Sequence, residues 1–121
     1  MDHLVLTVDD SRTMRDMLRF TLVDAGFRVV QAHDGAHGLE VLHSEQPDLI
    51  VTDINMPVMD GFGFIQGVRR EPRHRTTPIL VLTTEGDAEK KARARQAGAT
   101  GWIVKPFNPT KLVEVLRRVA P

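Results

Sequence analysis

The sequence predicts an α/β fold in which one doubly wound, five-stranded parallel sheet has helices on both faces. Two observations lead to this prediction. Five short apolar runs alternate along the chain with segments of helical periodicity, as in five successive βα units. Three of the runs are almost continuously apolar, which is typical of strands that are covered on both faces. Right-handed crossovers between parallel strands then leave few topologies.

The elements can be placed in order along the chain. The strands are expected at residues 4–8, 27–30, 49–52, 79–82 and 102–104. The first helix should end near Gly26 and the second before Pro47. Asp60 fits the N-cap of the third helix, and Asn108 followed by Pro109 is typical of the start of the fifth. The apolar positions that define the helices are Met14, Met17, Leu18 and Leu22 in the first, Gly38, Leu39 and Leu42 in the second, Phe62, Ile65 and Val68 in the third, Ala88, Ala92 and Ala97 in the fourth, and Leu112, Val113, Leu116 and Val119 in the fifth.

Composition limits the kind of protein this is. The 121 residues include 16 basic and 16 acidic side chains and no cysteine, so no net field attracts nucleic acid or a membrane surface, and no disulfide can form. The apolar runs are about six residues long at most, too short to cross a bilayer. We expect a single domain over residues 1–121 with no output domain, no leader peptide and a soluble, cytoplasmic location.

Polar side chains follow four of the five apolar runs. Asp9 and Asp10 end the first run, Asp53 the third, Thr83 and Thr84 the fourth, and Lys105 the fifth. The carboxyl ends of parallel strands meet at one edge of the sheet, where open α/β sheets bind their ligands. In the strand order 2-1-3-4-5 the first and third strands are neighbours, so Asp9, Asp10 and Asp53 should lie together.

Three carboxylates at one place indicate a particular chemistry. At a separation of ~4 Å and an effective dielectric constant of roughly 20, each like-charged pair costs about 4 kcal/mol. Such a site must take up protons or bind a cation. Carboxylate oxygens suit Mg²⁺, which proteins hold with one or two carboxylates and phosphate oxygens. A carboxylate beside Mg²⁺, with a lysine and a hydroxyl opposite, is suited to phosphoryl transfer through an aspartyl phosphate.

Four segments make the sequence recognisable: VDDSRTMR, TDINMPVMDGFGFI, VLTTE and GATGWIVKPF, in this order and spacing. Together they resemble the receiver domains of two-component response regulators, and the resemblance covers the whole chain. Among receivers, the chain looks most similar to the single-domain regulators of chemotaxis. The resemblance implies a flavodoxin-like (βα)5 fold, and the strand order 2-1-3-4-5 used above is the one known for that fold.

The resemblance also implies roles for the residues at the strand ends. Asp53 would be the phosphoacceptor, Asp10 would bind Mg²⁺ directly, and Asp9 would act mainly through a water molecule. The backbone carbonyl of Asn55 would supply another metal ligand. Lys105 would pair first with the Asp53 carboxylate and then with the phosphoryl group, and the peptide bond after this lysine is typically cis in the family.

The resemblance also implies which residues change conformation on phosphorylation and which set the lifetime of the phosphorylated state. Thr83 would donate its hydroxyl to a phosphoryl oxygen, and Trp102 would then turn inward, which changes the affinity of the face formed by helix four, strand five and helix five for a partner. Trp102 could instead be a static packed aromatic. Asn55 and Glu85 stand where receivers tune self-dephosphorylation. Thr84 replaces a commoner alanine or glycine and could restrict the phosphodonor or the attacking water.

The expected function is therefore that of a stand-alone, Mg²⁺-dependent phosphoacceptor rather than an enzyme that acts on other substrates. A histidine kinase would donate the phosphoryl group, a partner such as the flagellar motor switch would read the phosphorylated face, and a phosphatase is a further partner. Two alternatives stay open. One is a phosphorelay intermediate or phosphate sink. The other is a small phosphohydrolase, but that class commonly has an acidic residue two places after the nucleophile, where this chain has Asn55.

Two other groups of residues have simpler explanations. His33 and His37 have a spacing that can bind metal on a helix, but Asp34 fits an N-cap, so His33 should precede the helix. The basic segment RREPRHR at residues 69–75 contains no aromatic side chain and is expected to form a solvated helix end and loop. Neither nucleic acid nor a membrane is expected as the main partner.

Overall fold

The computed structural model describes residues 2–121 and has the predicted (βα)5 architecture, with each strand within two residues of its expected place. The strands are β1 (Leu4–Val8), β2 (Arg28–Ala32), β3 (Leu49–Thr52), β4 (Ile79–Thr83) and β5 (Gly101–Val104). The helices are α1 (Arg12–Asp24), α2 (Gly35–Glu45), α3 (Gly61–Arg70), α4 (Ala88–Ala97) and α5 (Pro109–Val119), and a short 3₁₀ helix, η1 (Pro72–His74), precedes β4. The strands are parallel in the order β2-β1-β3-β4-β5, which confirms the predicted fold class.

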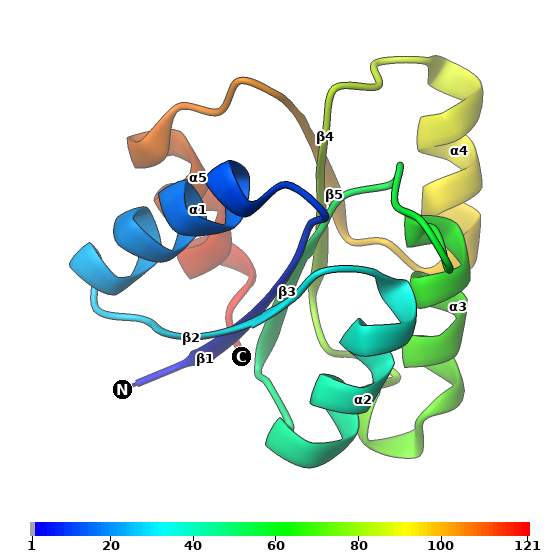
Figure 1. The fold of residues 1–121 in the computed structure, drawn as a ribbon, viewed down its shortest axis with the longest axis horizontal. Coiled ribbons are helices and arrows are strands. Elements are labelled where there is room, and N and C mark those ends of the chain that lie inside the picture. The colour runs from blue at the N-terminus through cyan, green and yellow to red at the C-terminus, as the bar shows by residue number, and fades with distance from the viewer. Residues whose placement is uncertain (1) are drawn as a thin grey trace.

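The sheet separates two layers of helices (Figure 1). α1 and α5 cover one face, and α2, α3 and α4 cover the other. Because side chains alternate along a strand, Val5 of β1 packs with the residues of α1 and α5, whereas Leu6 packs with those of α2 and α3. Every residue of β1 and β4 is buried, which explains why these runs are apolar apart from Thr7 and Thr83.

Side chains at the helix ends match the sequence prediction. Asp34, Asp60 and Asn108 each accept a hydrogen bond from a backbone N–H three residues ahead, at 2.8, 2.9 and 3.1 Å. His33 therefore lies before α2, as expected. Just past α1, Gly26 has a φ of 96°, a conformation that residues with a Cβ rarely adopt. None of the helices in the described part of the chain is long and apolar enough to cross a membrane.

The buried faces of two helices differ from the prediction. In α1, Leu18 is buried but Met17 is 50% exposed. In α4, the buried residue is Ala94, whereas Ala88 and Ala92 are exposed. Successive residues of a helix are about 100° apart, so Ala92 and Ala94 point in nearly opposite directions. The prediction that Ala88 and Ala92 line the buried side of this helix was wrong.

A polar network, called here the amino-end network, joins the segments that lead into β3, β4 and β5. Arg69 Nη1 donates to the carbonyl oxygens of His74 and Thr77, both at 2.7 Å. Arg69 Nε and Nη2 donate to the carbonyl oxygen of Gly98 at 3.1 and 2.7 Å. The buried His74 ring has Nδ1 2.8 Å from Thr77 Oγ1 and Nε2 3.1 Å from Gln46 Oε1. Three connections that are distant in sequence are thus held together by two side chains.

The basic segment at residues 69–75 is therefore only partly the solvated helix end and loop that its composition predicts. Arg70, Arg73 and Arg75 are exposed, but Arg69 is half-buried and His74 is buried. Burial lowers the pKa of the His74 ring, and the nearby positive charges of Arg69 and Arg73 act in the same direction. For Arg69 and His74 the prediction was wrong, because backbone carbonyls and neutral side chains satisfy them inside the fold.

Candidate functional site

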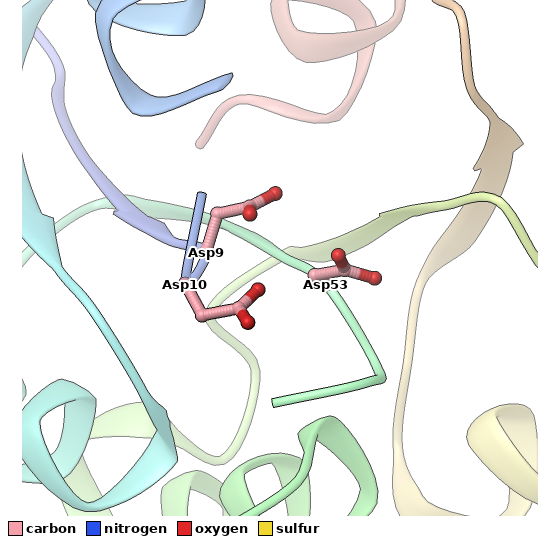
Figure 2. A group of neighbouring side chains, drawn as sticks. All are labelled: Asp9, Asp10 and Asp53. Carbon is pink, nitrogen blue, oxygen red and sulfur yellow. The ribbon is translucent and has the colours of Figure 1, made fainter. Parts of the chain in front are cut away.

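The three aspartates predicted at the strand ends lie together beyond β1 and β3 (Figure 2). Val8 pairs with Thr52 in the parallel register, and Asp53 N donates to the Val8 carbonyl at 2.9 Å, so the two strands end side by side. Carboxylate oxygens from Asp9, Asp10 and Asp53 lie within 4.8 Å of one another. Asp9 and Asp53 are only 1% and 8% exposed, whereas Asp10 is open to solvent. We call these three residues the acidic cluster.

Lys105 reaches the acidic cluster from the end of β5. Its Nζ donates to Asp9 Oδ2 at 2.8 Å and to Asp53 Oδ2 at 2.9 Å. Its backbone N–H donates to the carbonyl oxygen of Thr83 at 2.8 Å, which aligns the ends of β4 and β5. The Lys105–Pro106 peptide bond is cis, as the resemblance implies. The contact with Asp53 was expected from the resemblance, whereas the equally short contact with Asp9 was not.

Burial and charge act against each other in this group. Burial raises the pKa of the Asp9 carboxyl by more than its hydrogen bond from Lys105 lowers it. Burial alone would lower the pKa of Lys105, but its hydrogen bonds to Asp9 and Asp53 outweigh that effect and the pKa is raised. The ammonium group of Lys105 pairs with two of the three carboxylates, so negative charge remains uncompensated at a place where only Asp10 is open to solvent.

The acidic cluster fits a divalent cation. Within residues 2–121 it is the one group of three or more acidic or histidine side chains close enough to share an ion. Its ligand atoms are carboxylate oxygens, which hard cations prefer, and the exposed Asp10 leaves a route for water molecules. A doubly charged ion would also offset the excess of carboxylates over lysine. These are the properties of a magnesium site.

Neighbouring residues hold the Asp53 side chain and backbone in place. Asp53 Oδ1 accepts a hydrogen bond from Ile54 N at 2.6 Å. A Cβ atom at Gly61, the first residue of α3, would collide with the Asp53 carbonyl, so glycine allows this helix to begin against the site. Thr83 is fully buried at the end of β4, beside the strand that leads to Asp53, and Thr84 is exposed.

Glu85, on the loop between β4 and α4, links the site to two other elements. Its Oε1 accepts from Asn55 Nδ2 at 3.0 Å and from Lys90 Nζ at 3.1 Å, and these two hydrogen bonds lower the pKa of the Glu85 carboxyl. Its carbonyl oxygen accepts from Trp102 Nε1 at 2.9 Å, and its N–H donates weakly to Thr83 Oγ1 at 3.4 Å. Sequence reasoning missed Lys90, because ion pairs on a helix recur at three or four residues and this pair spans five.

The two histidines have a local structural role. His33 N donates to His37 Nδ1 at 3.2 Å, and His33 Nδ1 is 3.1 Å from Asp34 Oδ2. A His37 ring that accepts at Nδ1 carries its proton on Nε2, so that atom offers no lone pair to a metal. The two rings lie against each other with their centroids 4.2 Å apart and their planes tilted by 34°. This arrangement supports the expected turn before α2 and not a metal site.

Comparison with known proteins gives the family of this chain. The family model described as the response regulator receiver domain matches residues 5–117. The chain therefore belongs to the response regulator receiver domain family, and the resemblance noted in the sequence is confirmed. The strand order and the acidic cluster are in keeping with that membership.

Curated relatives of this chain differ in length. The chemotaxis protein CheY of Pseudomonas aeruginosa is 39% identical over 116 residues, which is 95% of this chain and 94% of that protein. The phosphate regulon transcriptional regulatory protein PhoB of Escherichia coli is 36% identical over 125 residues, which is 100% of this chain but 55% of PhoB. The chain likewise spans 44% of the probable transcriptional regulator ycf27 of Guillardia theta.

Solved structures agree with the fold over nearly the whole chain. The chemotaxis protein CheY4 of Vibrio cholerae has a TM-score of 0.94 and 48% identity, covering 98% of this chain and 99% of that one. The receiver domain of the sensor histidine kinase PA1611 from Pseudomonas aeruginosa has a TM-score of 0.90 and 26% identity, covering 98% and 97%. The PA1611 structure has a magnesium ion coordinated in its active site cleft.

Proposed function

We propose that Asp53 accepts a phosphoryl group from a histidine kinase in a Mg²⁺-dependent reaction. One observation carries the proposal: the Asp53 carboxylate lies at the end of β3, 2.9 Å from Lys105 Nζ and in the acidic cluster with Asp9 and Asp10. Membership of the receiver family supports the same site, as does the similarity of the whole chain to CheY proteins.

In the proposed transfer, a carboxylate oxygen of Asp53 forms a bond to phosphorus while the bond between phosphorus and the histidine nitrogen of the donor breaks. Lys105 would hold the carboxylate before the transfer and offset charge on the phosphoryl oxygens after it. The Thr83 hydroxyl would donate to one of those oxygens. Hydrolysis would restore the carboxylate, so the chain would promote only its own phosphorylation and dephosphorylation and would not act on other substrates.

The same residues would hold the metal ion. Asp10 and Asp53 would bind Mg²⁺ directly, the Asn55 backbone carbonyl would add a ligand, and Asp9 would contribute through a water molecule. The excess of carboxylates over lysine and the magnesium ion of the related PA1611 receiver support this assignment. When bound, Mg²⁺ would supply positive charge to the phosphoryl oxygens.

Phosphorylation would be read at the face formed by α4, β5 and α5. Trp102 on β5 is partly buried, and its indole donates to the Glu85 carbonyl, so it is linked to the loop that follows Thr83. A chemotaxis partner such as the flagellar motor switch is favoured, because CheY proteins match this chain over nearly their whole length. Asn55, Glu85 and Thr84 would tune the lifetime of the phosphorylated state, together with a phosphatase.

A phosphorelay intermediate or phosphate sink is the second candidate function. It is favoured by one observation: the solved structures similar to this chain include receiver domains of sensor histidine kinases. Transfer of the phosphoryl group from Asp53 back to a histidine-containing protein would favour this candidate, whereas phosphorylation-dependent binding of a motor-switch peptide would favour chemotaxis. Action without an output domain and a cytoplasmic location stay predictions.

The acceptor is tested by intact mass after incubation with Mg²⁺ and acetyl phosphate. The wild type should gain one phosphoryl group, Asp53→Asn should gain none, and Asp24→Asn, which changes an exposed aspartate of α1, should behave as the wild type. Trp102 fluorescence recorded in parallel would show whether this side chain responds. A gain in Asp53→Asn that maps to another residue would overturn the assignment. The assignment would also be overturned if the folded wild type neither gained a phosphoryl group nor bound beryllofluoride.

A further inference from the structure

Glu85 is held at both its backbone and its side chain. Its backbone contacts Thr83 and Trp102, as described above, and its carboxylate contacts Asn55 and Lys90 through the same oxygen. Asn55 lies two residues after Asp53, and Thr83 lies two residues before Glu85. The Glu85 side chain therefore joins the loop after β4 to the loop after β3, which begins at the proposed acceptor.

The ion pair between Lys90 and Glu85 adds little to the stability of the folded protein. The side chains of Lys90 and Glu85 are 39% and 30% exposed, and an ion pair with this much solvent access contributes ~1 kcal/mol or less. What distinguishes the pair is its position. Lys90 comes from the first turn of α4 and binds the carboxylate that contacts Asn55 on the loop following Asp53.

An uncompensated carboxylate at this place would oppose the proposed reaction. Small phosphodonors such as acetyl phosphate are anions, and the acidic cluster already carries more carboxylates than lysines. A further negative charge beside Asn55 would repel the donor as it approaches. Lys90 places a positive charge 3.1 Å from Glu85 Oε1 and so removes most of that repulsion.

We propose that Lys90 is a positioning residue for the phosphoryl-acceptor site: it holds the Glu85 carboxylate against Asn55 and offsets its charge where an anionic phosphodonor approaches. This inference rests on the proposed function of Asp53. Lys90 acts through Glu85 and touches neither the acceptor nor the donor. The pair would therefore determine how readily a charged donor reaches Asp53, without taking part in bond formation.

The test is the second-order rate constant for loading by acetyl phosphate with Mg²⁺, measured by intact mass. Lys90→Met should lower it about three- to tenfold at low salt, and the difference should shrink at ~1 M salt, where the Debye length is about 3 Å. Lys90→Arg should keep the wild-type rate. Lys91→Met is the matched control, since Lys91 is the next residue of α4, is exposed and has no ion pair within residues 2–121.

A double variant shows whether Lys90 acts through Glu85. In a Glu85→Gln background, Lys90→Met should lower the loading rate clearly less than it does in the wild type, because no carboxylate remains to be positioned and only the direct attraction between Lys90 and the anionic donor is lost. The proposal is overturned if Lys90→Met has no effect in the wild-type background, if its effect is equally large in Glu85→Gln, or if Lys91→Met has an effect of the same size. Circular dichroism of each variant separates a loss of fold from a loss of rate.

A second measurement does not depend on phosphorylation. In metal-free protein, exchange of the Asn55 side-chain amide protons with water, followed by NMR, should be faster in Lys90→Met than in the wild type or Lys91→Met. Unchanged exchange would show that Lys90 does not hold Glu85 against Asn55. If the wild type takes up neither a phosphoryl group nor beryllofluoride, the proposed function fails, and this measurement still decides whether Lys90 positions Glu85.

Discussion

The two ends of the sheet hold their polar side chains differently. In the amino-end network, every side-chain nitrogen of Arg69 and His74 has a hydrogen-bond partner. At the carboxyl ends of β1 and β3, the acidic cluster has three carboxylates, and one lysine pairs with two of them, Asp9 and Asp53. Both groups are wholly or partly buried, so burial does not distinguish them. The two groups differ in whether each polar or charged side chain has enough hydrogen-bond or ion-pair partners.

This difference separates a structural role from a chemical one. A buried polar group with all its partners stabilises one arrangement and has no capacity left for a ligand. A cluster with more negative than positive charge can still bind a cation or form a new bond. Removing a side chain should therefore destabilise the protein at the amino end and weaken ligand binding at the carboxyl end.

The largest expected effect is at the amino end. Arg69→Met should lower the free energy of unfolding by roughly 2–4 kcal/mol, because the carbonyl oxygens of His74, Thr77 and Gly98 lose their donors. Urea denaturation measures the change. Arg70→Met is the control, since Arg70 is exposed and its replacement should change stability by about 0.5 kcal/mol or less. Equal losses in the two variants would contradict a structural role for Arg69.

The second effect is at the carboxyl end and concerns binding. Asp10→Asn should weaken Mg²⁺ binding at least about tenfold, because it removes the charge of one of the proposed oxygen ligands. In metal-free protein the same change should leave the free energy of unfolding unchanged or raise it, because one like charge has gone. Titration calorimetry and urea denaturation give the two values, with Asp16→Asn of the exposed α1 surface as control. If Asp10→Asn lowered the free energy of unfolding but left the affinity for Mg²⁺ unchanged, the acidic cluster would have the structural role that is assigned here to the amino-end network.

The smallest effect is the response of the amino-end network to acid. Burial lowers the pKa of His74 in the folded protein, with Arg69 and Arg73 adding to the shift and Glu71 opposing it. Between that pKa and the unfolded value of about 6.5, the unfolded chain binds more protons. Stability from His74 should therefore be complete above pH ~6.5 and decrease as the pH falls through this window. The same pH slope in His74→Gln would show that other groups cause it.

Much of this molecule could be predicted from residue types and spacing. A continuous apolar run that ends in Asp53 indicates a buried strand, and the topology of parallel strands gathers their ends at one edge. The hydrogen bonds of the amino-end network could not be predicted in this way. The charge of Arg69 indicates exposure, yet its partners are three backbone carbonyls from two connections, the one between α3 and β4 and the one between α4 and β5. Ala92 and Ala94 give almost no hydrophobic signal, so the buried face of α4 could not be told from the exposed one.

Helix α4 buries little of its surface against the rest of the domain, and this affects how easily it can open locally. Ala94 is the buried residue of this helix, and Arg93 lies over the ring of Phe62 at 4.0 Å to its centroid. A segment with few buried contacts opens with a smaller free energy than the whole domain does. Each such opening would carry Lys90 away from Glu85 while the sheet stays intact. Access to the acceptor would then follow the local opening equilibrium of one helix, and a variant could change it without any change in global stability.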